Sequence, residues 1–157
     1  MADEEVLQLN SESETIAAGV ALSKQLQTGG LVFLHGDLGA GKTTLARGIL
    51  QGLGFGGQVR SPTYTLVERY PTEHVLVCHY DLYRMADPQE LEFIGARDDL
   101  VPGNLCLIEW PERGKGWLDC QLLDIHLTFC SQPSENIKKT GRQMRLRWHN
   151  RPKLPKK

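Results

Sequence analysis

The sequence predicts an α/β fold, with a single domain built on a central, mainly parallel (mixed) sheet flanked by helices. Short, continuous apolar runs at 31–34 and 105–108 are typical of strands that are buried on both faces, which is the pattern of parallel sheets. Segments with apolar residues at helical spacing follow such runs, as crossover connections require. A chain of 157 residues is long enough for one domain with its own core. We expect this domain to span residues 1–149.

The first elements are expected to be a short strand and a helix. Residues 6–9 are mostly apolar and predict the strand. Ser11 and Glu14 have the spacing of a capping box, which predicts a helix start. The pair Gly29-Gly30 is the expected helix end. One face of this helix would carry Ile16, Gly19, Val20, Leu22, Ser23 and Leu26.

Residues 36–43 read G-D-L-G-A-G-K-T, the pattern G-x-x-x-x-G-K-T of a phosphate-binding loop. The apolar run 31–34 enters this loop, and Leu45, Ile49 and Leu53 follow at helical spacing, so phosphate would lie at a helix N-terminus. In such loops the Lys side chain contacts the terminal phosphates and the Thr hydroxyl binds Mg²⁺. The sequence therefore predicts a P-loop NTPase. Its nucleotide contacts would come from Asp37, Leu38, Gly39, Ala40, Gly41, Lys42, Thr43 and Thr44.

The rest of the chain continues the α/β pattern. Four glycines at 52–57 predict a mobile connection after the P-loop helix. The segments 63–70 and 75–80 are expected strands, joined by a hairpin turn at 71–74. Asp87-Pro88-Gln89-Glu90 has the residues of a helix start. Late strands are expected at 122–129 and 143–149, the second with Met144, Leu146 and Trp148 on one face and Arg145 and Arg147 on the other.

Two apolar runs end in a carboxylate. Asp81 follows residues 75–80 and Glu109 follows residues 105–108, and both have the Walker-B form of a strand that delivers an acid to the edge of the sheet. Mg²⁺ and an attacking water each need an oxygen partner. We expect Asp81 in the metal shell and Glu109 as a base that orients water or as a second metal-shell group. Which of the two binds Mg²⁺ directly is left open.

A third element is Ser61-Pro62-Thr63, which follows the glycine-rich stretch. A Thr63 hydroxyl could close on phosphate or metal, as switch loops do, although an ordinary Ser-Pro turn explains the residues equally well. Possible charge-neutralising side chains are Arg60, Arg84 and Arg113, and no spacing singles one of them out.

Composition is that of an ordinary globular chain, with 40% hydrophobic and 24% charged residues and a net charge of −1. No signal peptide or apolar stretch of transmembrane length is present, so we expect a cytoplasmic protein without a membrane contact. The four cysteines lack C-x-x-C spacing and are expected to be reduced core residues. No acidic residue follows Glu135, and residues 150–157 are expected to form a disordered basic tail. This basic end is either a solvated tail or a contact for nucleic acid or an acidic partner.

Four stretches together resemble the bacterial TsaE (YjeE) ATPases in order and spacing. They are G-D-L-G-A-G-K-T-T at 36–44, S-P-T-Y-T-L-V-E at 61–68, H-Y-D-L-Y-R at 79–84 and I-E-W-P-E at 108–112. The segment D-P-Q-E-L-E-F at 87–93 is similar as well, and the resemblance covers about residues 5–130. Tyr80 stands where the family often has Phe, and the last 25 residues carry no usable family signature.

The resemblance implies a small ATPase that is required for threonylcarbamoyl modification of adenosine 37 in tRNA. Its cofactors would be ATP and Mg²⁺, and it would act with TsaB and TsaD, which carry out the transfer, with at most a weak or indirect contact to tRNA. The family's residue roles place Lys42 and Thr43 on phosphate and Mg²⁺, and Asp81 as the Walker-B acid. They make residues 61–63 a first switch and Glu109 with Trp110 a second. They point weakly to Glu12 and Thr15 near the adenine.

The residues alone do not separate an ATPase from a small-molecule kinase with the same P-loop. A kinase usually has an arginine-bearing lid over the donor, and no compact arginine-rich segment lies between the P-loop and Glu109. The interpretation as a GTPase has less support still, because the sequence has no N-K-x-D motif, which reads guanine. A nucleotide-dependent assembly factor with negligible turnover alone is a third class.

Overall fold

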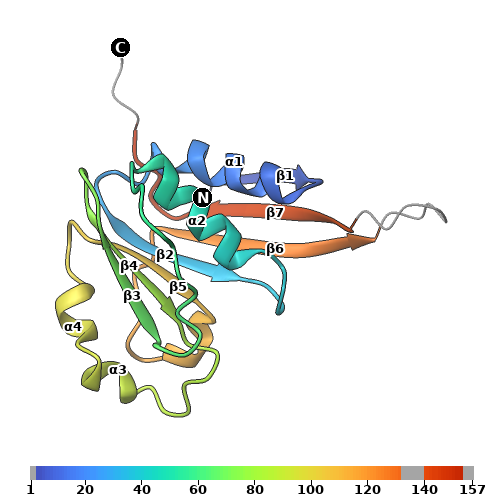
Figure 1. Ribbon diagram of the computed structural model, residues 1–157. Helices are drawn as coiled ribbons and strands as arrows, with labels where there is room; N and C mark the ends of the chain where they lie inside the picture. Colours follow the sequence, from blue (N-terminus) through green and yellow to red (C-terminus); the bar gives the residue numbers. More distant parts are fainter. Residues whose placement is uncertain (1–2, 132–139, 154–157) are drawn as a thin grey trace.

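The apolar runs assemble into one sheet, which the computed structural model describes together with its helices over residues 3–131 and 140–153 (Figure 1). The sheet has seven strands in the order β1-β7-β6-β2-β5-β4-β3 within the described residues. These strands are β1 (Asp3–Leu9), β2 (Gly30–His35), β3 (Val67–Pro71), β4 (Leu76–Asp81), β5 (Leu105–Glu109), β6 (Leu123–Ser131) and β7 (Thr140–Trp148). The helices are α1 (Glu12–Ser23), α2 (Lys42–Gly52), α3 (Glu90–Phe93), α4 (Ala96–Asp99) and the 3₁₀ turn η1 (Pro111–Gly114).

Four parallel strands form the centre of the sheet. β2 pairs in parallel with both β5 and β6, and β5 pairs in parallel with β4. The edges are antiparallel, because β3 forms a hairpin with β4 and β7 lies between β6 and β1. The predicted α/β fold is therefore confirmed, with a sheet that is mixed. Since β2, β4 and β5 run in the same direction, the P-loop, Asp81 and Glu109 meet at one edge of the sheet.

Helices α1 and α2 cover one face of the sheet and pack closely on each other (Figure 1). Two glycines permit the close approach. A β-carbon at Gly19 would lie 2.7 Å from the carbonyl oxygen of Leu45, and one at Gly48 would overlap the carbonyl of Ile16. The apolar residues of both helices join Val32, Leu34 and their neighbours in the larger core. This packing fixes the N-terminus of α2, which follows the P-loop.

The capping box at the start of α1 is present in a shifted form. The Ser11 hydroxyl accepts the backbone N–H of Glu14 at 3.1 Å, as predicted. The Glu14 carboxylate accepts the N–H of Asn10, one residue before the cap. The helix ends at Ser23, where the Ser23 hydroxyl bonds back to Val20, and turns fill the residues before Gly29-Gly30. The expected helix end at that glycine pair is therefore too late.

The second core lies on the opposite face of the sheet, under α3 and α4. Asp99 at the end of α4 is its polar anchor, and it is 4% exposed. Nε and Nη2 of Arg69 donate to this carboxylate at 2.9 and 2.7 Å, and the Tyr80 hydroxyl also donates to it. Burial alone would raise the pKa of Asp99, but the hydrogen bonds from Arg69 and Tyr80 hold it below its usual range. The anchor ties α4 to strands β3 and β4.

The strand expected at 63–70 is shorter than predicted. Residues 62–65 form turns, the N–H of Leu66 donates to the carbonyl of Pro62 at 2.8 Å, and β3 begins only at Val67. Leu66 has φ of 67°, which breaks the extended conformation. The hairpin turn at 71–74 is confirmed by the antiparallel pairing of β3 with β4. The first part of the expected strand is instead a loop near the carboxyl end of β4.

The C-terminal part follows the predicted alternation. Met144, Leu146 and Trp148 of β7 are buried, while Arg145 and Arg147 are exposed. Arg151 forms ion pairs with Asp3, at 2.9 Å, and with Glu5 on β1. The expectation of a disordered tail at 150–157 therefore does not describe Arg151, and its last four residues lie outside the described part of the chain.

The cysteines occupy different environments. Cys78 and Cys106 are buried in the second core, as expected, but Cys120 is exposed and Cys130 is only partly buried. All four have free thiols. The prediction that they are core residues is wrong for Cys120, because its segment is a surface connection before β6. Within the described residues, no helix has the length and apolar character that crossing a membrane requires.

Candidate nucleotide-binding site

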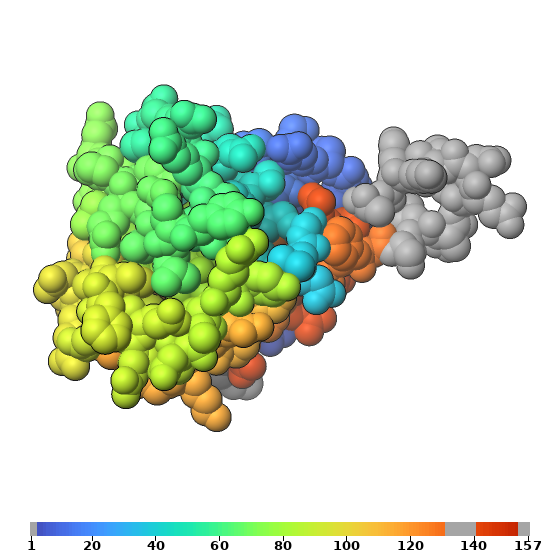
Figure 2. Space-filling model, turned by 60° about the horizontal axis from the view of Figure 1, so that its bottom comes forward, coloured from blue at the N-terminus to red at the C-terminus, as the bar shows by residue number. Residues whose placement is uncertain are grey.

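The P-loop connects β2 to α2 and surrounds a cavity of about 270 Å³. Figure 2 shows it, in cyan, at the molecular surface beside the orange end of β6. Gly39 and Gly41 have φ of 79° and 107°, the left-handed region that favours glycine and lets backbone N–H groups turn toward a bound anion. The cavity is lined by Leu38, Gly39, Ala40, Gly41, Lys42, Thr43, Thr44, Thr63, Asp81, Glu109, Trp110 and Arg142.

Lys42 lies inside the site, 5% exposed, at the first position of α2. Its ammonium donates to the carbonyl of Gly36 and, at 3.3 Å, to that of Asp37, and it lies 4.2 Å from the centre of the Trp110 ring. Burial lowers the pKa of Lys42 from its usual value, and the charges of Glu109 and Asp81 oppose that shift. The ammonium is held by neutral groups that a phosphate oxygen could replace.

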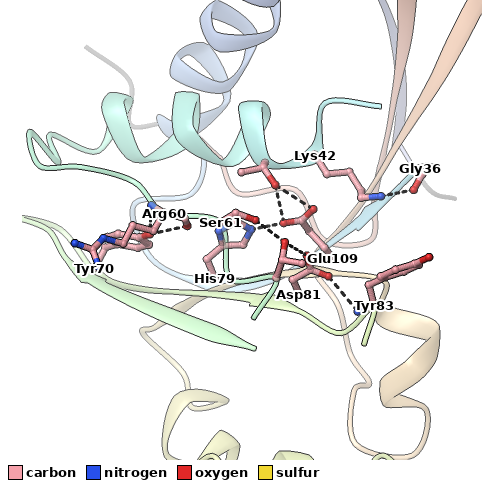
Figure 3. A network of polar contacts seen from close by, with 11 residues as sticks. Gly36, Lys42, Arg60, Ser61, Tyr70, His79, Asp81, Tyr83 and Glu109 are labelled. Carbon is pink, nitrogen blue, oxygen red and sulfur yellow. Dashed lines mark hydrogen bonds and ion pairs between the residues drawn. The ribbon is translucent and has the colours of Figure 1, made fainter. Parts of the chain in front are cut away.

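Glu109 ends β5 and joins two other side chains at the centre of the site (Figure 3). The Thr43 hydroxyl lies 3.2 Å from Oε2 of Glu109, and Nε2 of His79 lies 2.7 Å from the same oxygen. His79 is fully buried, and its Nδ1 has no partner among the described residues. A neutral imidazole with its proton on Nε2 satisfies this geometry, because the unpaired Nδ1 is then a lone pair. His79 therefore fixes the orientation of the Glu109 carboxylate from the buried side of the site.

Asp81 ends β4 and is the direct neighbour of Glu109 across the sheet. One of its oxygens accepts the Thr63 hydroxyl at 3.2 Å, and the other accepts the N–H of Tyr83 at 3.0 Å. The Ser61 and Thr63 hydroxyls are 2.7 Å apart. The loop expected as a first switch thus reaches the site through the bond from Thr63 to Asp81, and Figure 3 shows Ser61 of this loop near Asp81.

Trp110 follows Glu109 and has φ of 57°, unusual for a bulky residue. This conformation turns the chain into η1 and places the indole between Lys42 and the Tyr83 ring, whose centre is 5.1 Å away. The backbone strain at this position sets the indole against the ammonium. Trp110 is therefore placed to respond when Lys42 changes its partners.

Some predicted residues lie elsewhere. The Asp37 side chain is exposed and does not line the cavity, although its carbonyl accepts from Lys42. Glu12 is paired with Arg47 of α2 at 3.6 Å, and the buried Thr15 hydroxyl bonds to the carbonyl of Ser11. Neither lines the cavity, and an adenine contact for them stays a prediction. The three arginines suggested as charge-neutralising groups, Arg60, Arg84 and Arg113, are also not among the lining residues.

Two residues were missed by sequence reasoning. His79 stands two residues before Asp81 on β4, and this spacing is the signal that both face the same side of the sheet. Arg142 comes from β7, about a hundred positions after the P-loop, and Nη2 of Arg142 donates to the carbonyl of Gly39 at 3.2 Å. No local pattern marks it, because its place depends on how β7 pairs in the sheet.

A separate cluster of possible metal ligands lies on β2 and β6. It joins His35, Asp124 and His126, whose ligand atoms lie within 4.8 Å of one another. Asp124 already accepts hydrogen bonds from His35 at 2.7 Å and from His149 at 2.6 Å. These bonds give each carboxylate oxygen a hydrogen-bond partner. The cluster therefore links β2, β6 and the end of β7 through hydrogen bonds.

The loop follows β2, a parallel strand of the mixed sheet, next to two neighbouring strand-end carboxylates and a buried Lys. This arrangement is that of the P-loop class of nucleotide-binding proteins. A family model described as "Threonylcarbamoyl adenosine biosynthesis protein TsaE" matches residues 9–140. The chain belongs to the TsaE family, which confirms the resemblance drawn from the sequence.

Individual relatives agree with this membership. Proteins named "tRNA threonylcarbamoyladenosine biosynthesis protein TsaE" include one from Haemophilus influenzae, 60% identical over 56% of this chain and 56% of its own length. One from Rickettsia felis is 40% identical over 78% of this chain and 71% of its own. The chain thus spans just over half the length of the Haemophilus relative. The crystal structure of Bacillus subtilis YdiB has the same fold, with a TM-score of 0.69 at 24% identity, over 94% of this chain and 87% of that one.

Proposed function

We propose that this protein is a Mg²⁺-dependent ATPase that serves threonylcarbamoyl modification of adenosine 37 in tRNA, together with TsaB and TsaD. The single observation that carries the ATPase proposal is the convergence of Lys42, Thr43 and Glu109 at the N-terminus of α2. Lys42 supplies a cation for phosphate. Thr43 and Glu109 supply a hydroxyl and a carboxylate for the metal and the attacking water. The tRNA role rests on family membership and on the names of the relatives, and such a role belongs to the cytoplasm.

The P-loop residues would bind the triphosphate. Residues 38–43 line the cavity, where their backbone N–H groups would donate to phosphate oxygens, and the α2 N-terminus would add its partial positive charge. Lys42 would exchange the Gly36 and Asp37 carbonyls for β- and γ-phosphate oxygens. The exchange is favourable, because a phosphate oxygen carries charge and a carbonyl does not.

The oxygen donors fit Mg²⁺, which prefers hydroxyl, carboxylate and water ligands. The Thr43 hydroxyl, Asp81 and Glu109 would hold the ion directly or through water, and when bound it would neutralise phosphate charge. Thr63 is held at Asp81 and would follow the ion and the γ-phosphate as a switch residue.

Glu109 would orient the attacking water. Hydrolysis forms a bond from the water oxygen to the γ-phosphorus, breaks the bond from that phosphorus to the β–γ bridging oxygen, and releases ADP and phosphate. Glu109 would accept the water proton, while the bond from His79 keeps one carboxylate oxygen fixed. This leaves the other oxygen to face the water. The buried His79 is then a positioning residue for Glu109.

A small-molecule kinase remains the alternative, since it would use the same phosphate site. A kinase transfers the γ-phosphoryl group to an acceptor, whereas the proposed ATPase transfers it to water. Phosphate release with and without TsaB and TsaD separates the two. We expect slow release from the protein alone and a marked increase with both partners. Full turnover by the isolated protein with no stimulation would refute the partner dependence, and ATP consumption without phosphate release would favour the kinase.

A further inference from the structure

Three potential metal ligands share one face of the sheet where β2 and β6 lie side by side. His35, the last residue of β2, is the register partner of His126 on β6. Asp124 stands two residues before His126 on the same strand, so its side chain lies on the same face. The atoms that these side chains can offer to a metal all lie within 4.8 Å of one another. The three side chains do not line the P-loop cavity, so they form a separate cluster.

The spacing of the cluster is close to that of a tetrahedral metal site. Bonds of about 2.0–2.1 Å to nitrogen or oxygen place neighbouring ligand atoms roughly 3.4 Å apart. Nε2 of His35 lies 2.7 Å from Oδ1 of Asp124, and the rings of His35 and His126 are stacked with their centres 4.2 Å apart. The remaining adjustment falls on His126, whose exposed ring can rotate about its side-chain bonds.

Asp124 is held by neighbours that would not compete with an ion. Its Oδ2 accepts from Nε2 of His149 at 2.6 Å and from the amide of Gln121 at 3.2 Å, whereas Oδ1 faces His35. Carboxylates that bind metals are commonly oriented by outer hydrogen bonds of this kind. An ion on Oδ1 leaves both bonds to Oδ2 in place. It requires only that the His35 proton sits on Nδ1, which is the other neutral tautomer.

The surroundings select the kind of ion. Arg145 and Arg147 on β7 are the register partners of His126 and Asp124. Their positive charges oppose a cation that is held by charge alone. Mg²⁺ and Ca²⁺ take oxygen ligands, whereas Zn²⁺ forms strong bonds to imidazole nitrogen. Two imidazoles and one carboxylate beside two arginines therefore favour Zn²⁺.

This face of the sheet is open to solvent. Among the described residues, the second core contains no side chain from β1, β6 or β7, so α3 and α4 leave these strands uncovered. A cavity of about 360 Å³ lies over them and reaches His126. It is lined by Glu4, His126, Thr128, Gln143, Arg145 and Arg147. An ion can thus reach the cluster from solution.

We propose that His35, Asp124 and His126 bind Zn²⁺, with water as the fourth ligand and His149 as the residue that orients Asp124. The ion joins β2 to β6 at the residue that precedes the P-loop. It shares no ligand with the proposed Mg²⁺ site, so either site can fail without the other. Because the ligands meet only in the folded chain, Zn²⁺ stabilises the fold.

The test titrates Zn²⁺ by calorimetry into the full-length protein, free of any histidine tag, and into His126→Ala, His149→Ala and His74→Ala. His74 is the matched control, an exposed histidine in the turn between β3 and β4. We expect wild type to bind Zn²⁺ and to gain thermal stability from it, and His74→Ala to match wild type. Loss of an outer-shell partner typically weakens metal binding 10- to 100-fold. His149→Ala should therefore lose about tenfold, and His126→Ala, which removes a direct ligand, at least as much.

Three results would overturn the assignment. No Zn²⁺ binding by wild type would leave the cluster as a hydrogen-bonded link alone. Equal Zn²⁺ affinity in wild type and His126→Ala would place the ion on other ligands, such as the exposed Cys120. An equal loss in His74→Ala would mean unspecific binding to surface histidines. If His126→Ala unfolds at a lower temperature without metal, His126→Gln keeps the side-chain size, removes the imidazole and must show the same loss of Zn²⁺ affinity.

Discussion

Glu109→Gln separates nucleotide binding from chemistry. Gln keeps the size of the side chain and one oxygen that can accept the bond from His79, now 2.7 Å from Glu109. The Gln amide N–H can donate to the Thr43 hydroxyl, so the hydrogen bond between the two side chains is kept and only its donor and acceptor are exchanged. Glu109 is 3% exposed, and the substitution removes a buried charge without opening a cavity. We therefore expect the variant to fold and to bind ATP within a few-fold of wild type.

The effect on turnover should be much larger. Gln cannot take a proton from the attacking water, and loss of a general base typically lowers the rate by ~10²–10⁴-fold. If Glu109 contributed only a hydrogen bond to Thr43, the loss would be about 1 kcal/mol, or roughly fivefold. The two roles thus differ by more than an order of magnitude in the expected rate.

The assay is phosphate release in the presence of TsaB and TsaD, with ATP affinity measured on the same preparations. Glu73→Gln is the matched control, because Glu73 is exposed in the turn between β3 and β4 and does not line the P-loop cavity. We expect Glu73→Gln to match wild type. A Glu109→Gln rate within about twofold of wild type would show that Glu109 has no catalytic role.

Two further predictions concern stability. Gly48→Ala should lower the free energy of unfolding by more than ~2 kcal/mol in urea titrations, because its methyl group would overlap the Ile16 carbonyl and separate α1 from α2; a change below ~0.5 kcal/mol would contradict this packing. Asp99→Asn should lower the free energy of unfolding by about 2 kcal/mol at pH 7. This loss is smaller than the loss expected on breaking a fully buried ion pair, because the Arg69 side chain is 41% exposed and can be hydrated. The Asp99 pKa is lower in the folded than in the unfolded state, so its stabilisation is present above about pH 4 and is lost as the pH falls through the folded value. The difference between wild type and Asp99→Asn should therefore shrink below pH 4, and a constant difference would refute the ion pair.

Local patterns predicted the central strands well. The runs entering the P-loop and ending at Asp81 and Glu109 are apolar because both faces of those strands are buried, and burial is visible in sequence. Parallel strands end at the same edge of a sheet. The sequence could therefore predict that Asp81 and Glu109, from distant segments, lie close together. Strand β3 was overestimated, because Leu66 adopts a left-handed conformation that its residue type does not favour.

The remaining site residues depend on tertiary pairing. Arg142 looked like one of many basic residues near the C-terminus, and only the β6–β7–β1 pairing brings it to Gly39. The reverse holds for Arg60, which precedes the switch loop in sequence but contacts Tyr70 through its backbone. Sequence proximity to a motif was therefore a poor guide to which arginine lines the P-loop cavity. Strand order decided it.

The most direct test of a nucleotide site in the P-loop is calorimetric titration of ATP into wild type and Lys42→Ala. Among the described residues, the Lys42 ammonium donates to the carbonyls of Gly36 and Asp37 and lies over the Trp110 ring, and these contacts belong to the loop itself, so its loss should leave the fold intact. Removal of a charged partner of the terminal phosphates typically costs ~1.5–3 kcal/mol, or about 10- to 150-fold in affinity. We expect ATP binding to weaken by that factor while thermal unfolding stays unchanged. Equal ATP affinity in the two proteins would contradict the assignment of the P-loop as the ATP site.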